Sequence, residues 1–240
     1  MLRKFAQKRA RAMGFNVTRA TAIGHPLEWL LGFARQNGVT TILDVGANVG
    51  QFAKSVSAAG WKGKILSFEP LAAAHAQLLA ASANNPQWTI AGRGALGATA
   101  GTAEINVAGN SQSSSLLPML NRHSQAAPTS AYVATEAVPV TPLDKAIANL
   151  DTNEVFLLKM DVQGFESEVL RGAKETFCRT PIIYSEMSLQ PLYSGEKLFT
   201  DLASEIIELG YRCIGIQPGY VDPSNLEMLQ VDATFLRNVL

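Results

Sequence analysis

The chain has 240 residues, of which 47% are hydrophobic and 17% are charged. This composition is typical of one large globular domain with a full core, and it excludes an intrinsically disordered chain. Equal numbers of acidic and basic residues give a formal net charge of zero, which argues against a nucleic-acid-binding protein. No apolar run of about 18 residues occurs, so no membrane-spanning helix is predicted.

Positive charge is concentrated in residues 1–20, which contain bases but no acid. Such a segment can make a peripheral membrane contact, although a solvated first helix or a frayed terminus is the favoured interpretation. It lacks the apolar centre of a secretory signal. Cys178 and Cys213 match no metal-ligand spacing and fall in predicted core elements, where they would stay reduced. These features predict a cytoplasmic protein, and a homo-oligomer is left open.

The first predicted elements are a helix, a strand and a glycine-bearing turn. Apolar residues at helical spacing indicate a helix over 26–37, and the apolar run 40–45 predicts a strand. This strand contains Asp44 near its end. Gly46 and Gly50 follow, and they let the backbone turn sharply and come close to a ligand. The next helix directs free N–H groups at that turn, where an anionic group can bind.

A second strand over 65–69 ends in Glu69, whose carboxylate can accept hydrogen bonds from both hydroxyls of a ribose. An alanine-rich helix follows. A third strand is expected near 88–91, and the alternation over 102–107 indicates an additional strand.

Residues 109–142 differ in kind from the rest of the chain. They are rich in serine and proline and show little periodicity. A segment of this length inside a compact domain is usually a functional lid or a disordered loop. We expect a lid or substrate-contacting insertion, carried by a domain over 40–240 that follows an N-terminal helical, basic segment over 1–39.

The second half restores the alternation of strands and helices. The continuous apolar run ending in Asp161 predicts a strand buried on both faces, as in a parallel sheet. A helix through Val169, Leu170, Ala173 and Phe177 is expected to follow it. The strand over 180–186 ends in Glu186. A helix over 196–209 is followed by two strands that we expect to be antiparallel neighbours, at 211–216 and 231–236.

Four strands therefore each deliver a carboxylate to one edge of the sheet: Asp44, Glu69, Asp161 and Glu186. Ligands of open α/β sheets bind beyond the carboxyl ends of the strands. One acid at a strand end is commonly a helix cap. Taken together, the four outline an active site.

The glycine turn reads G-A-N-V-G-Q, and this discriminates between two classes of cofactor. A dinucleotide loop has the pattern G-x-G-x-x-G, and Asn48 occupies the place of its second glycine. An acid followed by G-x-x-x-G instead resembles the first motif of class I methyltransferases. S-adenosylmethionine is therefore favoured. The alternatives are an NAD-dependent oxidoreductase and a non-catalytic S-adenosylmethionine-binding protein.

Further motifs extend this resemblance. D-V-G-A-N-V-G-Q-F from Asp44, F-E-P from Phe68, the serines of 111–115 and K-M-D-V-Q-G-F-E from Lys159 resemble the FkbM family of S-adenosylmethionine-dependent O-methyltransferases. The similarity covers about residues 40 to 237. It implies a class I methyltransferase (Rossmann-like) fold, a seven-stranded, mostly parallel sheet with helices on both faces. It also implies methylation of a hydroxyl, often on a sugar of a glycan or glycolipid, sometimes on a polyketide.

The resemblance also assigns cofactor-binding positions. It implies that the methionine end of the cofactor is surrounded by Asp44, Gly46, Asn48 and Gly50, and that Glu69 binds the ribose. Ala95 and Leu96 would border the adenine, and Asp161 would lie nearest the transferred methyl group.

The methylated hydroxyl benefits from a general base, and Asp161 is the leading candidate. Lys159 precedes it on the same strand. Glu166 and Glu186 could orient the substrate or join Asp161 around Mg²⁺, but metal dependence is not favoured and no metal ligand is assigned. His123, in the predicted lid, is a further candidate base, although a lone histidine in a loop is more often merely solvated.

Overall fold

The computed structural model describes residues 9–10, 12–13 and 26–238. Most of the basic segment 1–20 lies outside the described residues, and so do both interpretations of it, the favoured solvated helix or frayed terminus and the peripheral membrane contact. In the part of the chain that the structure describes, none of the helices combines the length and the hydropathy that a membrane span requires.

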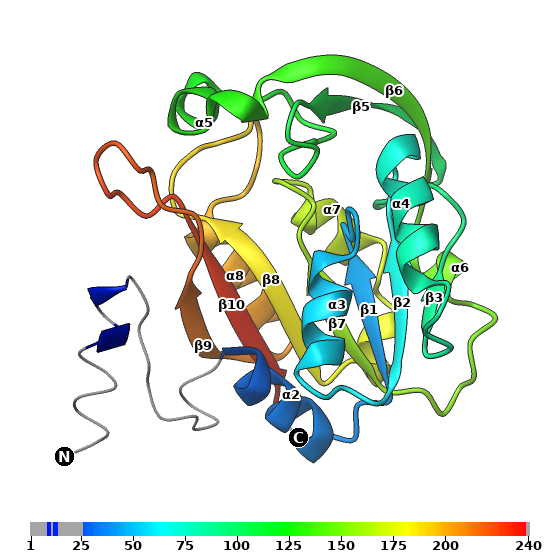
Figure 1. Cartoon of the computed structure of the whole chain (residues 1–240). Coiled ribbons are helices and arrows are strands. Elements are labelled where there is room, and N and C mark those ends of the chain that lie inside the picture. Colours follow the sequence, from blue (N-terminus) through cyan, green and yellow to red (C-terminus); the bar gives the residue numbers. More distant parts are fainter. Residues whose placement is uncertain (1–8, 11, 14–25, 239–240) are drawn as a thin grey trace.

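Seven strands form the central sheet, in the order β3-β2-β1-β7-β8-β10-β9 (Figure 1). The strands are β1 (Thr41–Val45), β2 (Lys64–Phe68), β3 (Trp88–Ile90), β7 (Phe156–Met160), β8 (Ile182–Ser188), β9 (Tyr211–Pro218) and β10 (Gln230–Arg237). β10 is antiparallel to both β8 and β9, and the other neighbouring pairs are parallel. The predicted class I fold and the antiparallel pair at the end of the chain are confirmed.

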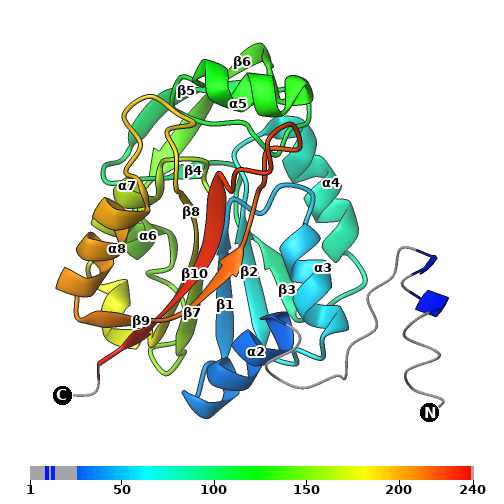
Figure 2. The same ribbon diagram turned by 90° about the vertical axis from the view of Figure 1, so that its left-hand side faces the viewer.

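Helices cover both faces of this sheet (Figure 2). One face carries α2 (Pro26–Gln36), α3 (Gln51–Ala58) and α4 (Ala72–Ser82), and the other carries α6 (Leu143–Ala146), α7 (Glu166–Arg171) and α8 (Phe199–Glu208). Successive strand side chains point to opposite faces. Ile42 accordingly packs in the cluster under α2 and α3, whereas Leu43 packs in the cluster under α8. Two apolar clusters therefore hold one sheet between two helix layers.

A second, three-stranded sheet arches over the carboxyl ends of the central strands (Figure 1). It contains β4 (Ala95–Leu96), β5 (Gly101–Ala108) and β6 (Tyr132–Thr141), with α5 (Asn121–Ala126) and a 3₁₀ helix, η1 (Pro128–Ser130), between β5 and β6. β5 matches the additional strand that the sequence predicts. β6 occupies part of the segment 109–142, where no strand is predicted. Most of its side chains are exposed or half-buried and only Val138 is fully buried, so the core imposes little alternation on it.

Two local expectations are wrong. The helix after Asp161 does not run through Phe177. α7 ends at Gly172, where a Cβ would lie 2.2 Å from the carbonyl oxygen of Gly97, and a 3₁₀ helix, η2 (Thr176–Arg179), follows. Cys178 and Cys213 are exposed rather than buried in the core, because one lies on η2 and the other on the edge strand β9.

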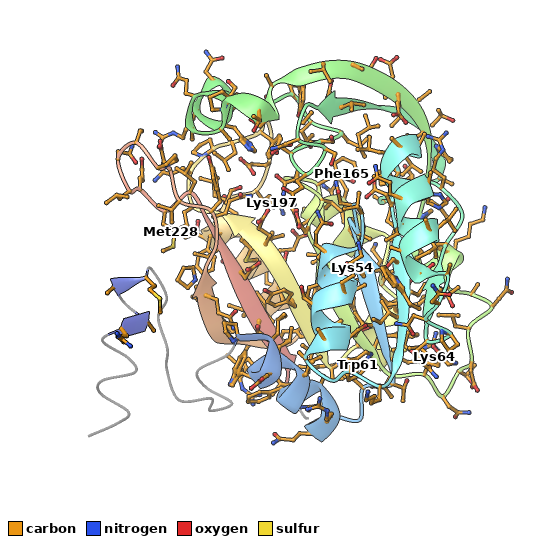
Figure 3. The ribbon with its side chains drawn as sticks, viewed as in Figure 1. Lys54, Trp61, Lys64, Phe165, Lys197 and Met228 are labelled. Atoms are coloured by element: carbon orange, nitrogen blue, oxygen red, sulfur yellow. The ribbon has the colours of Figure 1, made fainter. Side chains whose placement is uncertain are left out.

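The two ends of the sheet differ in what covers them. Figure 3 labels Phe165 beneath the arch, at the end of the molecule where the parallel strands finish. Trp61 and Lys64 are labelled at the opposite end, where β2 begins. The arch thus encloses the edge at which the strand-end acids were expected.

Candidate active site

A cavity of about 450 Å³ lies between this sheet edge and the arch. Of the residues predicted for the site, its lining contains Gly46, Asn48, Glu69, Ala95, Leu96, His123, Asp161 and Glu186. Asp44 and Gly50 do not line it. The structure therefore brings most of the predicted residues to one cavity and places two of them behind its wall.

Glu69 is held rigidly at one side of the cavity. Its two carboxylate oxygens accept hydrogen bonds from the backbone N–H groups of Asn48, at 2.7 Å, and Leu71, at 2.8 Å. Burial raises the pKa of Glu69 to about 7, against the opposite effect of these two hydrogen bonds. Because a carboxylate oxygen has two lone pairs, each oxygen can accept a further hydrogen bond from a ligand.

A Cβ on either glycine of the turn would meet protein, although Gly46 itself also lines the cavity. Gly46 has a φ of 74°, and a Cβ there would lie 1.8 Å from the carbonyl oxygen of Asp161. Gly50 has a φ of 86°, and a Cβ there would lie 2.4 Å from the ring of Trp88. The expected close approach of a ligand to these glycines stays a prediction. The structure adds that the missing Cβ atoms let the turn pack closely on Asp161, just after β7, and on Trp88 of β3.

Asp44 acts through a buried ion pair. Its carboxylate lies 3.1 Å from the ammonium of Lys159 and accepts a hydrogen bond from the Ser67 hydroxyl at 2.9 Å. The same ammonium donates to the carbonyl oxygen of Gly46 at 2.8 Å. Burial alone would lower the pKa of Lys159, but the carboxylates of Asp44 and Asp161 outweigh it and the pKa is raised. Asp44 and Lys159 together fix the backbone of the turn.

Asp161 and Glu186 are joined by one side chain, Gln163. Its amide nitrogen donates to Asp161 Oδ1 and to Glu186 Oε2, both at 2.7 Å. Its amide oxygen accepts from the hydroxyl of Tyr193, also at 2.7 Å. Gln163 has a φ of 54°, a left-handed conformation that non-glycine residues rarely adopt. This strained residue therefore sets the orientation of both carboxylates.

A third acid, Asp232, completes a carboxylate cluster that we define as Asp161, Glu186 and Asp232. Asp232 lies directly opposite Glu186 in the antiparallel pair of β8 and β10. It is hydrogen-bonded by Tyr184, and burial raises its pKa to about 6. Burial, followed by repulsion from Asp161 and Asp232, raises the pKa of Glu186 well above its ordinary value. Gln230 donates a further hydrogen bond to Glu186 at 2.8 Å.

Sequence reasoning assigned no role to Gln163, Tyr184, Gln230 or Asp232, although all of them line the cavity. A signal was present for the strand residues. Tyr184 and Glu186 are two positions apart, as are Gln230 and Asp232, and such spacing places polar groups on one sheet face within otherwise apolar strands.

His123 lies in the cavity wall but differs from the solvated loop residue that the sequence leaves as an alternative. It is buried on α5, with its ring edge-on to Tyr193 at 5.1 Å between centroids. Its Nδ1 atom has no hydrogen-bond partner. Burial lowers the pKa of His123 to about 4, so the ring is neutral at physiological pH and a weaker base than a solvated histidine.

Glu166 closes the turn that follows Asp161. One of its oxygens accepts hydrogen bonds from the backbone N–H groups of Val162, at 3.0 Å, and Gly164, at 3.3 Å. Burial raises the pKa of Glu166 to about 7. Glu166 therefore shapes the backbone that carries Gln163, and it does not line the cavity.

The serines of 111–115 join the arch to the turns below it. The side chains of Ser111 and Asn48 are hydrogen-bonded at 3.1 Å. Ser115 donates to the carbonyl oxygen of Gln163 at 2.7 Å, and Tyr193 donates to the carbonyl oxygen of Ser113 at 3.0 Å. The first half of the predicted lid thus spans the cavity from the glycine turn to Gln163.

Within the described residues, no group of three or more His, Cys, Asp or Glu side chains is arranged to hold a metal ion.

Known proteins resemble the chain in sequence and in fold. Residues 44–213 match the Methyltransferase FkbM domain. The 2-O-methyltransferase NoeI of Sinorhizobium fredii (strain NBRC 101917 / NGR234) is 42% identical over 60 residues, and this match spans a quarter of either protein.

Two solved structures are also similar to the chain. Fibrillarin of Aeropyrum pernix, solved with bound S-adenosyl-L-methionine, has a TM-score of 0.48 and 10% identity, over 86% of this chain and 74% of that one. The magnesium protoporphyrin IX methyltransferase of Synechocystis PCC 6803, solved with the same cofactor, has a TM-score of 0.46 and 8% identity, over 88% and 78%.

Proposed function

The chain belongs to the FkbM methyltransferase family, and from that premise we propose that it transfers a methyl group from S-adenosylmethionine to a hydroxyl oxygen. One observation carries the proposal. Glu69, with lone pairs free for a diol, and Asp161, exposed over 37% of its side chain, line the same cavity. Glu69 can thus bind the ribose hydroxyls of a nucleoside, and Asp161 can contact a reacting alcohol.

The residues of the cavity fit this cofactor. Ala95 and Leu96, which the family resemblance assigns to the adenine, line the cavity with apolar side chains. Glu69 can accept hydrogen bonds from the ribose hydroxyls. The sulfonium of the cofactor is positive, and Asp161, proposed to lie nearest the transferred methyl group, supplies a carboxylate of opposite charge. When bound, the cofactor supplies an electrophilic methyl group.

Asp161 is the base that this geometry supports best. Asp161 would hold the acceptor hydroxyl and take its proton, and the bound cofactor would supply the methyl group, whose bond to sulfur would break with its electron pair passing to sulfur. Gln163 holds the other carboxylate oxygen of Asp161 in place. His123 is buried and has a lowered pKa, so its imidazole takes a proton less readily. Base assistance of this kind contributes about 10²–10⁴-fold to the rate.

The class of acceptor is proposed to be a sugar hydroxyl of a glycan or glycolipid. The short stretch of identity with a 2-O-methyltransferase supports transfer to oxygen. Protein dipoles and hydrogen bonds that align the alcohol with the methyl group can contribute on the order of 7–11 kcal/mol.

Incubation of the purified protein with methyl-labelled S-adenosylmethionine and fractionated cell extract tests this function. The proposal expects label in a fraction whose fragmentation in mass spectrometry identifies a methyl ether. Label on a nitrogen or on a carboxyl group would contradict transfer to a hydroxyl. Parallel calorimetric titrations with NAD and with S-adenosylmethionine test the alternative oxidoreductase, which requires tight binding of NAD.

A further inference from the structure

The cavity has two walls of different character. The glycine turn, Glu69 and β4 form the wall proposed for the cofactor. The opposite wall consists of the carboxylate cluster together with His123 on α5 and Tyr220 on the loop between β9 and β10. The family resemblance implies a place for Asp161 of this wall nearest the transferred methyl group, and it implies no role for Asp232, His123 or Tyr220 as parts of an acceptor site. This wall is the part of the cavity left for an acceptor.

The second wall carries an excess of negative charge. Its carboxylates are those of Asp161, Glu186 and Asp232, and Lys159 is the only Lys or Arg side chain in the described cavity lining. That ammonium is already engaged at 3.1 Å by Asp44, and it lies 3.9 Å from Asp161. One buried cation is therefore shared between its own carboxylate partner and the cluster.

The amide groups of this wall are also occupied. The amide nitrogen of Gln163 donates to both Asp161 and Glu186, and that of Gln230 donates to Glu186. These donors stabilise the carboxylates of the cluster and are turned toward them rather than toward a ligand. An anionic ligand at this wall would meet like charges with no free cation beside them, which disfavours binding.

Two aromatic rings belong to the same wall as the cluster. His123 and Tyr220 both line the cavity, and their ring centroids lie 6.2 Å apart. A pyranose ring exposes C–H groups on its faces, which pack on aromatic rings, and hydroxyls on its edge, which donate to carboxylates. A wall that combines carboxylates with aromatic rings suits such a sugar ring.

We infer that this wall is the acceptor subsite and that it takes a hydroxyl-bearing ring without negative charge, either neutral or carrying an ammonium group. The inference rests on the proposed methyl transfer and narrows its substrate class. Sugars with a carboxylate or phosphate next to the methylated hydroxyl are excluded by the charge of the cluster.

Binding of three matched probes tests the inference without knowledge of the natural acceptor. The probes are methyl β-D-glucopyranoside, its uronate and its 2-amino-2-deoxy analogue. Each is added to protein saturated with S-adenosylhomocysteine and followed by saturation-transfer NMR. We expect the neutral and ammonium probes to bind at least about tenfold more tightly than the uronate.

Variants assign this selectivity to the cluster. Asp232→Asn removes one carboxylate from the wall. We expect this variant to reduce the difference in affinity between the neutral probe and the uronate. Glu186→Gln gives the same expected result if the first variant does not fold. Glu104→Gln, at an exposed position of β5 outside the cavity lining, is the matched control. It should bind the neutral probe and the uronate with the same difference in affinity as the native protein.

Three outcomes would overturn the inference: equal or tighter binding of the uronate, no binding of any probe, or selectivity that survives both cluster variants. A prior titration separates these from failure of the proposed function. If S-adenosylhomocysteine itself does not bind, the methyltransferase proposal falls and the inference falls with it. If it binds and the uronate is preferred, only the acceptor inference is wrong.

Discussion

Asp232 on β10 lies directly opposite Glu186 on β8, so two acids face one another across an antiparallel strand pair. Like charges in this position destabilise a sheet. The pKa of each acid is raised by burial first and by the neighbouring carboxylates second. Buried acids with raised pKa values are typical of functional sites, and this facing pair fits that pattern.

This relationship predicts a pH dependence of stability. A carboxyl group whose pKa is raised on folding stabilises the folded state at low pH, and that contribution is lost as the pH rises toward the folded pKa. Burial raises the pKa of Glu69 and Glu166 to about 7 and that of Asp232 to about 6, and it raises that of Glu186. The lowered pKa of His123 acts in the opposite direction, but it is a single group. We expect the ligand-free protein to melt at a lower temperature at about pH 8 than at about pH 5.

Asp232→Asn isolates one contributor to this effect. Removal of the charge is expected to raise stability near pH 8 by about 2 kcal/mol, or about 5 °C in melting temperature, with a smaller change near pH 5. Scanning calorimetry at both pH values measures the difference. A melting temperature that rises between pH 5 and pH 8 would contradict the raised pKa values of Glu186 and Asp232.

Glu69→Gln tests the cofactor wall. A neutral amide presents one acceptor in place of two, and it cannot accept both backbone hydrogen bonds from Asn48 and Leu71. Loss of charged hydrogen bonds of this kind costs about 1.5–3 kcal/mol, so the affinity for S-adenosylhomocysteine should fall about 10- to 100-fold. Calorimetry measures the affinity of this variant and of Glu104→Gln for S-adenosylhomocysteine, and Glu104→Gln should bind as tightly as the native protein. Equal affinities in the two variants would remove Glu69 from the cofactor site.

Asp161→Asn tests the proposed base. The substitution keeps an oxygen for the hydrogen bond from Gln163 while abolishing the basic carboxylate. The rate of single-turnover methyl transfer to the cell-extract fraction that acquires label should fall by about 10²–10⁴-fold. Cofactor affinity should change little. Unaltered turnover would exclude Asp161 as the base, whereas loss of cofactor binding would assign it to the cofactor.

Gly46→Ala tests the packing of the glycine turn. The added Cβ meets the carbonyl oxygen of Asp161 at a residue that also requires a positive φ, so we expect a loss of about 3 kcal/mol in unfolding free energy. Gly60→Ala has a positive φ but open space, and should lose about 1 kcal/mol. Gly92 has neither a positive φ nor a close neighbour, so Gly92→Ala should leave the unfolding free energy unchanged. Denaturant unfolding ranks the three, and equal stabilities would contradict a packing role for Gly46.

Much of the fold was predictable because the central strands are buried on both faces. Their continuous apolar runs, such as Phe156–Met160, end at acids that the parallel topology brings to one edge. β6 was missed because most of its side chains are not buried, and Pro139 interrupts its pattern.

The parts of the site that could not be predicted depend on contacts between residues far apart in the chain. Gln163 joins two carboxylates only because its backbone adopts a left-handed conformation. His123 lies in a segment that reads as a polar loop, and it is buried because Tyr193 and Tyr220 pack against it. Nothing within either local sequence signals these contacts.

The most direct test of the account is a calorimetric titration of the native protein with S-adenosylhomocysteine. A cavity with Glu69 at one wall and Asp161 at the other predicts saturable binding of one equivalent, weakened by Glu69→Gln. Absence of binding heat at several temperatures, with protein whose cooperative unfolding shows it to be folded, would contradict the proposed function.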